Sequence, residues 1–64
     1  MHALAWKSRF VVRLAELFAQ GGVDTNTALA DAHVHAEDCY ERGKYEEPEQ
    51  EADSLYRKLK IDSF

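Results

Sequence analysis

Residues 24–43 decide how this chain folds, and they read DTNTALADAHVHAEDCYERG. At helical spacing, an apolar line runs through this stretch in steps of three and four residues: Leu29, Ala32, Ala36, Cys39 and Gly43. Such spacing is typical of a heptad-like seam. Because most of the seam residues are small, another helix can come close to them. The pattern therefore predicts that this helix is the central packing surface of the fold.

The ends of this helix also carry sequence signals. Asp24 is expected to be its N-cap, with Thr25 or Thr27 as alternatives, because a side-chain oxygen can accept a hydrogen bond from an unpaired N–H of the first turn. Gly43 is expected to stop it, since glycine adopts the left-handed conformation found after many helices. These signals place the second helix at residues 24–42.

Residues 3–20 form the clearest helix of the chain, ALAWKSRFVVRLAELFAQ. Its apolar stripe holds most of the large apolar side chains, among them Trp6, Phe10, Leu14, Leu17 and Phe18. The glycine pair that follows at 21–22 predicts its end.

A third helix is expected at residues 48–60. Pro48 suits the first helical position because its φ is already fixed at a helical value. Acidic residues crowd this end of the helix, while Arg57, Lys58 and Lys60 lie toward the other end. Both placements are favoured by the helix dipole.

The sequence therefore predicts an all-α fold, a single helical domain over residues 1–64. The second and third helices are expected to form a hairpin, and the first helix adds its bulky apolar face. A chain this short buries only about 60% of its unfolded surface, so a partner subunit commonly supports it. We therefore expect dimerisation to complete a small bundle. The residues expected at the interface are Trp6, Phe10, Leu14, Leu17, Phe18, Leu29, Ala36 and Tyr40.

Charge is distributed unevenly along the chain, whose net charge is −4. Residues 1–20 carry three cations against one acid, residues 21–53 carry two against ten, and residues 54–64 carry three against one. This layout favours packing of the basic ends against the acidic middle, within one chain or between two. It argues against direct binding of nucleic acid. It also leaves open a second use, in which the acidic middle imitates nucleic-acid phosphates and blocks a DNA- or RNA-binding partner.

A transition-metal site is the most specific chemical function that the sequence suggests. Asp31, His35 and Cys39 follow one another at steps of four residues, so they lie on one helix face. Imidazole and thiolate are ligands that zinc favours, but zinc normally takes four. One helix supplies only part of such a set. The alternative is that His35 and Cys39 border the seam without a metal, and no other cofactor is expected.

The function expected from these observations is a small cytosolic protein–protein interaction module, such as an adaptor, an accessory subunit or an inhibitor. A metal-binding or metal-sensing dimer that uses His35 and Cys39 is the alternative. An enzyme is not expected, because no motif assembles a nucleophile, a base and a stabilising group. The single cysteine suggests a reducing compartment. No apolar run reaches 18 residues, so no membrane span is expected.

Overall fold

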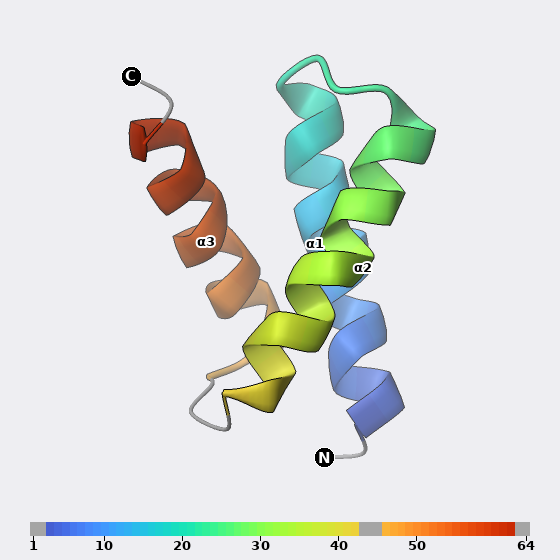
Figure 1. Cartoon of the computed structure of the whole chain (residues 1–64), viewed down its shortest axis with the longest axis vertical. Coiled ribbons are helices and arrows are strands. Elements are labelled where there is room, and N and C mark those ends of the chain that lie inside the picture. The colour runs from blue at the N-terminus through green and yellow to red at the C-terminus, as the bar shows by residue number, and fades with distance from the viewer. Residues whose placement is uncertain (1–2, 43–45, 63–64) are drawn as a thin grey trace.

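A computed structural model describes residues 3–42 and 46–62 of the chain, with side chains up to residue 60. Within those residues it contains three helices and no strand: α1 (Ala3–Gln20), α2 (Thr25–Glu41) and α3 (Pro48–Asp62). The helices run up, down and up again in Figure 1, where α2 crosses in front of α1 and α3 diverges from both. The all-α class is confirmed, and each helix begins and ends within two residues of its expected position.

The turn between α1 and α2 is built as the glycine pair predicted. The Val23 N–H donates to the Phe18 carbonyl at 3.0 Å, and the Gly22 N–H donates to the Ala19 carbonyl at 3.0 Å. These two bonds form a Schellman motif. Gly22 has a φ of +98°, a left-handed value that side chains with a Cβ rarely adopt. The glycine therefore allows the chain to reverse within a few residues.

The N-cap of α2 is also confirmed. The Asp24 carboxylate accepts hydrogen bonds from the Asn26 N–H at 3.1 Å and from the Thr27 N–H at 3.3 Å. The other expected end signal, Gly43, lies outside the described residues, as does its place in the seam.

The central helix of the fold is α1, and not α2 as the small-residue seam suggested. α1 packs against both other helices, whereas no Cα of α2 lies within 8 Å of a Cα of α3 in the described part of the chain. The expected hairpin packing of α2 on α3 is therefore not found. The large side chains of α1 occupy the space between the two helices, and the small residues of α2 serve only to bring that helix close to α1.

The core is covered within one chain. Its buried residues come from all three helices: Trp6, Phe10, Val11, Leu14, Ala15, Ala28, Ala32, Ala36 and Ala52. Ala32 and Ala36 of the predicted seam are buried, but at its first position Ala28, 1% exposed, replaces Leu29, which is 39% exposed. Four small side chains on α2 and α3 leave room for the rings of α1, so large residues on one helix pack against small residues on its neighbours.

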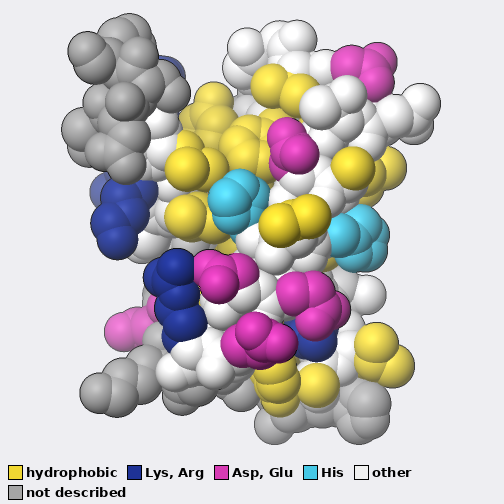
Figure 2. All heavy atoms as spheres, viewed as in Figure 1, with side chains coloured by type: hydrophobic (Ala, Val, Ile, Leu, Met, Phe, Trp, Pro, Cys, Tyr) yellow, Lys and Arg dark blue, Asp and Glu magenta, His cyan; other side chains and the backbone are white. Residues whose placement is uncertain are grey.

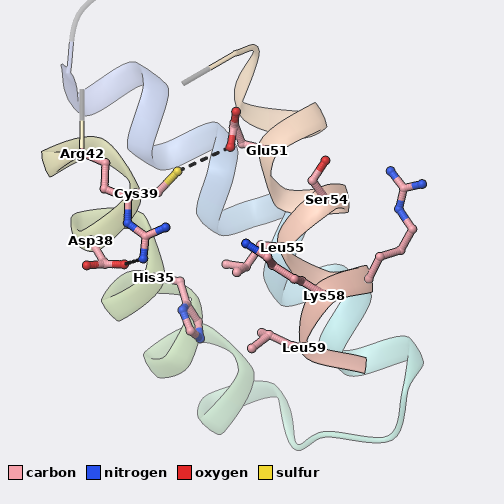
Figure 3. A pocket seen from close by; sticks show the side chains of 10 residues that line it. His35, Asp38, Cys39, Arg42, Glu51, Ser54, Leu55, Lys58 and Leu59 are labelled. Atoms are coloured by element: carbon pink, nitrogen blue, oxygen red, sulfur yellow. Dashed lines mark hydrogen bonds and ion pairs between the residues drawn. The ribbon is translucent and has the colours of Figure 1, made fainter. Parts of the chain in front are cut away.

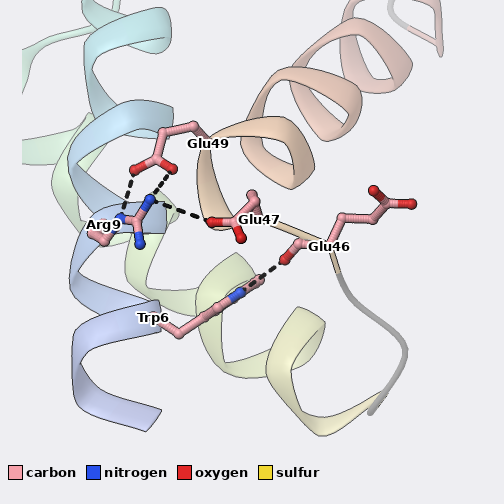
Figure 4. Close-up of polar contacts among 5 residues, drawn as sticks. All are labelled: Trp6, Arg9, Glu46, Glu47 and Glu49. Carbon is pink, nitrogen blue, oxygen red and sulfur yellow. Dashed lines mark hydrogen bonds and ion pairs between the residues drawn. The ribbon is translucent and has the colours of Figure 1, made fainter. Parts of the chain in front are cut away.

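Ion pairs between α1 and its neighbours confirm that basic and acidic segments pack together within one chain. Lys7 Nζ lies 3.0 Å from Glu37 of α2, and Arg13 Nε lies 2.8 Å from Asp53 of α3. Arg9 reaches the start of α3, where its guanidinium lies 2.6 Å from Glu49 (Figure 4). The hydrogen bond from Arg9 lowers the pKa of the Glu49 carboxyl. These pairs join segments that are 30 or 40 residues apart in the sequence.

Candidate functional site

A groove with a volume of about 640 Å³ lies between α2 and α3. Its α2 wall consists of His35, Asp38, Cys39 and Arg42. Its α3 wall consists of Glu51, Ser54, Leu55, Arg57, Lys58 and Leu59. The groove exists because α2 and α3 both pack on α1 but diverge from each other (Figure 1). In the same view, Figure 2 shows hydrophobic side chains gathered between α3 and α2 beside a histidine.

Phe18 of α1 contacts one aromatic residue on each of the other two helices. Its ring lies 6.4 Å from the His35 ring of α2 and 5.8 Å from the Tyr56 ring of α3, measured between centroids and tilted in both cases. Phe18 is itself only partly buried. Phe18 does not line the groove itself, but its ring packs behind His35 of the α2 wall and supports that wall from α1.

The walls follow from helical spacing. His35, Cys39 and Arg42 are four and three residues apart, so they lie on one face of α2. Leu55 and Leu59 are four residues apart on α3 and are partly buried, with Lys58 beside them. Figure 3 shows the Leu55, Lys58 and Leu59 side chains on the groove side of α3, opposite His35. Each wall thus combines apolar and polar groups.

Most of the charged groups in the groove already have partners. Arg42 lies 2.7 Å from the Asp38 carboxylate on the same helix. The Glu51 carboxylate accepts a hydrogen bond from the Glu46 N–H at 2.9 Å and one from the Cys39 thiol at 3.7 Å. The thiol bond is drawn across the groove in Figure 3. These contacts satisfy both acids of the walls from within the chain.

Arg57 and Lys58 differ from the other charged groups of the groove. Among the described residues, neither has a carboxylate within 4 Å, and both side chains are exposed. The sequence predicted these cations as favourable partners of the helix dipole and as part of a basic end that packs against the acidic middle. Their place in a groove wall was missed, because it depends on how far α3 diverges from α2. The groove therefore carries positive charge that no carboxylate of the described residues neutralises, beside apolar side chains.

Cys39 is held as a protonated thiol. Burial raises its pKa, and the negative charge of Glu51, to which the thiol donates, raises it further. Thiolate is the reactive form of cysteine, so a raised pKa makes this residue a poor nucleophile near neutral pH. Cys39 contributes a small, weakly polar surface to the groove, which matches its expected place at the border of the seam.

The residues expected to bind a metal are not brought together as a ligand set. His35 and Cys39 both line the groove, but Asp31 is exposed and does not line it. Within the part of the chain that the structure describes, no group of three His, Cys, Asp or Glu side chains is placed to hold a metal ion. His35 faces the Phe18 ring, and Cys39 bonds to Glu51.

The acidic middle of the chain is partly neutralised. Of the ten acids in residues 21–53, five lie within 4 Å of an Arg or Lys side chain: Glu37, Asp38, Glu47, Glu49 and Asp53. A mimic of nucleic-acid phosphates needs dense negative charge that faces outward. Four of these five acids, all except Asp38, pair with a cation of α1 and so connect it to the acidic middle of the chain.

Several of the residues expected at a dimer interface are internal. Trp6, Phe10, Leu14 and Ala36 are at most 2% exposed and are covered by their own chain. Leu17, Phe18 and Tyr40 are partly buried, and Leu29 is exposed. The large apolar side chains expected at the interface are thus largely covered within one chain, while dimerisation itself stays a prediction.

Comparisons with protein-family models, curated proteins and solved structures found no match for this chain. In addition, no helix among the described residues is long and apolar enough to cross a membrane.

Proposed function

We propose that this chain is a small helical protein–protein interaction module that works without catalysis and binds its partner in the groove between α2 and α3. The observation that carries the proposal is the composition of the groove. Leu55 and Leu59 offer apolar contact, and Lys58 offers a positive charge that no carboxylate of the described residues neutralises. An apolar centre with a charged rim is the usual composition of a protein interface.

The open shape of the groove favours a protein segment over a small molecule as the ligand. Small-molecule sites commonly have volumes of about 300–1,000 Å³ but enclose most of the ligand surface. This groove, at about 640 Å³, lies open between two diverging helices. A partner side chain can enter from outside while the rest of the partner stays on the surface.

The lone Cys39 is a free thiol, and we place the module in the cytoplasm, where free thiols persist.

Site-specific photo-crosslinking in an extract of the source cells tests this proposal. A photoreactive amino acid replaces Ser54, an exposed residue of the groove wall, or Ala30, an exposed residue of α2 outside the groove. The proposal predicts a covalent adduct with another protein from position 54, lost when excess unmodified chain is added, and no such adduct from position 30. Equal adducts from both positions, or none that the unmodified chain displaces, would contradict it.

A further inference from the structure

The backbone of the groove walls limits the kind of segment that can bind. Both walls are helices, whose backbone N–H and C=O groups are already bonded along the helix. Within the described residues there is no strand that could pair with an extended peptide. A segment that enters the groove must therefore satisfy its own backbone hydrogen bonds, and a helix does so.

The length of the wall fits a little more than two turns of a helix. The wall runs from Glu51 to Leu59 of α3, which corresponds to roughly 12 Å at the helical rise. Leu55 and Leu59 lie one turn apart along this wall. A helix that places apolar residues at spacings of three and four can contact both leucines at once.

The charged residues of the groove walls indicate which sign of charge the incoming helix carries beside its apolar stripe. Asp38 is paired with Arg42, and Glu51 accepts two hydrogen bonds, so the acids of the walls are already engaged. Arg57 and Lys58 are not paired with any carboxylate among the described residues. Charge complementarity at an interface therefore favours carboxylates on the incoming segment.

We infer that the occupant of the groove is an acidic amphipathic helix from a partner protein. Its apolar stripe packs on Leu55 and Leu59, and its Asp or Glu residues, on the side that faces α3, pair with Lys58 and Arg57. This inference rests on the proposed function and adds the chemical class of the partner to it.

Two synthetic peptides of about 16 residues test the inference, each long enough for four helical turns. Both carry leucine at positions i, i+3, i+4 and i+7; one has glutamate at the flanking positions, and the other has lysine there. Binding of each fluorescent peptide to the full chain is followed by anisotropy. We expect the glutamate peptide to bind at least about tenfold more tightly than the lysine peptide, and to weaken as salt is raised.

A matched pair of variants assigns the effect to the groove. Lys58→Glu and Lys60→Glu change the net charge equally, but Lys60 does not line the groove. Lys58→Glu is expected to remove the preference for the glutamate peptide, while Lys60→Glu largely keeps it. Amide shifts in NMR spectra are expected at His35, Leu55 and Leu59, and not around Val12, which is 64% exposed on α1.

Four results would overturn the inference: equal affinity for both peptides, no binding of either, shifts centred on Val12, or occupation of the groove by a second copy of the chain. The proposed function can survive the failure of this inference. If position 54 gives a specific protein adduct in cell extract while neither peptide binds, the groove is an interaction site but its partner is not an acidic helix.

Discussion

The indole N–H of Trp6 donates a hydrogen bond to the backbone carbonyl of Glu46 at 3.0 Å (Figure 4). Trp6 belongs to the first turn and a half of α1, and Glu46 precedes α3, so the bond ties together segments 40 residues apart. The Trp6 ring also lies 5.3 Å from Phe10 and 5.7 Å from Tyr40 of α2. One side chain thus contacts α2 and the entry to α3, and it fixes the end at which these two helices come closest.

Trp6→Phe is expected to destabilise the fold by about 1–3 kcal/mol, because it leaves the Glu46 carbonyl without this donor and removes part of a buried ring. Chemical unfolding followed by circular dichroism measures the change. Tyr40→Phe is the matched control, since it also alters an aromatic residue of this cluster but keeps the ring. An unfolding free energy within about 0.5 kcal/mol of the original for Trp6→Phe would show that the bond does not anchor α3.

Ala32→Leu is expected to destabilise the fold by about 1–3 kcal/mol or more, because Ala32 is 0% exposed where α2 lies against α1. Ala30→Leu makes the same change at an exposed position of the same helix. That control is expected to change the unfolding free energy by less than about 0.5 kcal/mol. Equal effects in urea titrations of the two variants would contradict close packing of α2 on α1 through its small residues.

The Arg13–Asp53 pair is expected to contribute only modestly. Its two side chains are 35% and 41% exposed, and partly exposed ion pairs are worth about 0.2–1 kcal/mol. A double-mutant cycle with Arg13→Ala and Asp53→Ala should give a coupling energy in that range, and about 1 M salt should reduce it. The Arg42–Asp38 pair within α2 provides a comparison. A coupling energy that does not depend on salt would argue against an ion pair in solution.

Cys39 is expected to react slowly with alkylating reagents near neutral pH, and its rate should rise only above the pH at which an ordinary thiol ionises. The cause is its raised pKa, due first to burial and then to the charge of Glu51. Glu51→Gln removes that charge and should move the rate profile to lower pH. Asp31→Asn makes a comparable change at a residue that does not shift this pKa. Identical profiles for all three proteins, measured by mass spectrometry, would be inconsistent with the Cys39–Glu51 contact.

The raised pKa of Cys39 also determines how the stability of the fold changes with pH. Since folding raises the pKa of the thiol, the folded chain holds that proton more tightly than the unfolded chain. The contribution to stability is complete below the ordinary pKa of cysteine and is lost as the pH rises through the folded value. For Glu49 the sign is opposite: its pKa is lowered by Arg9, so its contribution is present at neutral pH and is lost in acid.

The helices were predictable because their signals are local. Asp24, Gly22 and Pro48 act on the nearest few backbone groups, and each has its expected role. The pairing of basic with acidic segments was predictable for a related reason, since the sign of charge along the chain already restricts which segments can adjoin.

The relative placement of the helices was not predictable in the same way. Small residues in α2 indicate that a neighbour comes close, but they do not indicate how many neighbours there are. That number is set by Trp6, Phe10 and Leu14, whose bulk on α1 leaves room for a helix on each side. The groove depends on the resulting divergence of α2 from α3. His35 and Cys39 were singled out from the sequence, but for metal binding, and Lys58 was not associated with them.

Isotope-filtered NMR on an equal mixture of labelled and unlabelled protein tests most directly whether one chain covers its own core and leaves the groove open. The account predicts that contacts between Phe18 and Tyr56, and between Trp6 and Tyr40, arise within one chain. The filtered spectrum, which records only contacts between chains, should lack them. If these contacts appear in the filtered spectrum, the helices are exchanged between two chains, and the single-chain groove on which the proposed function rests does not exist.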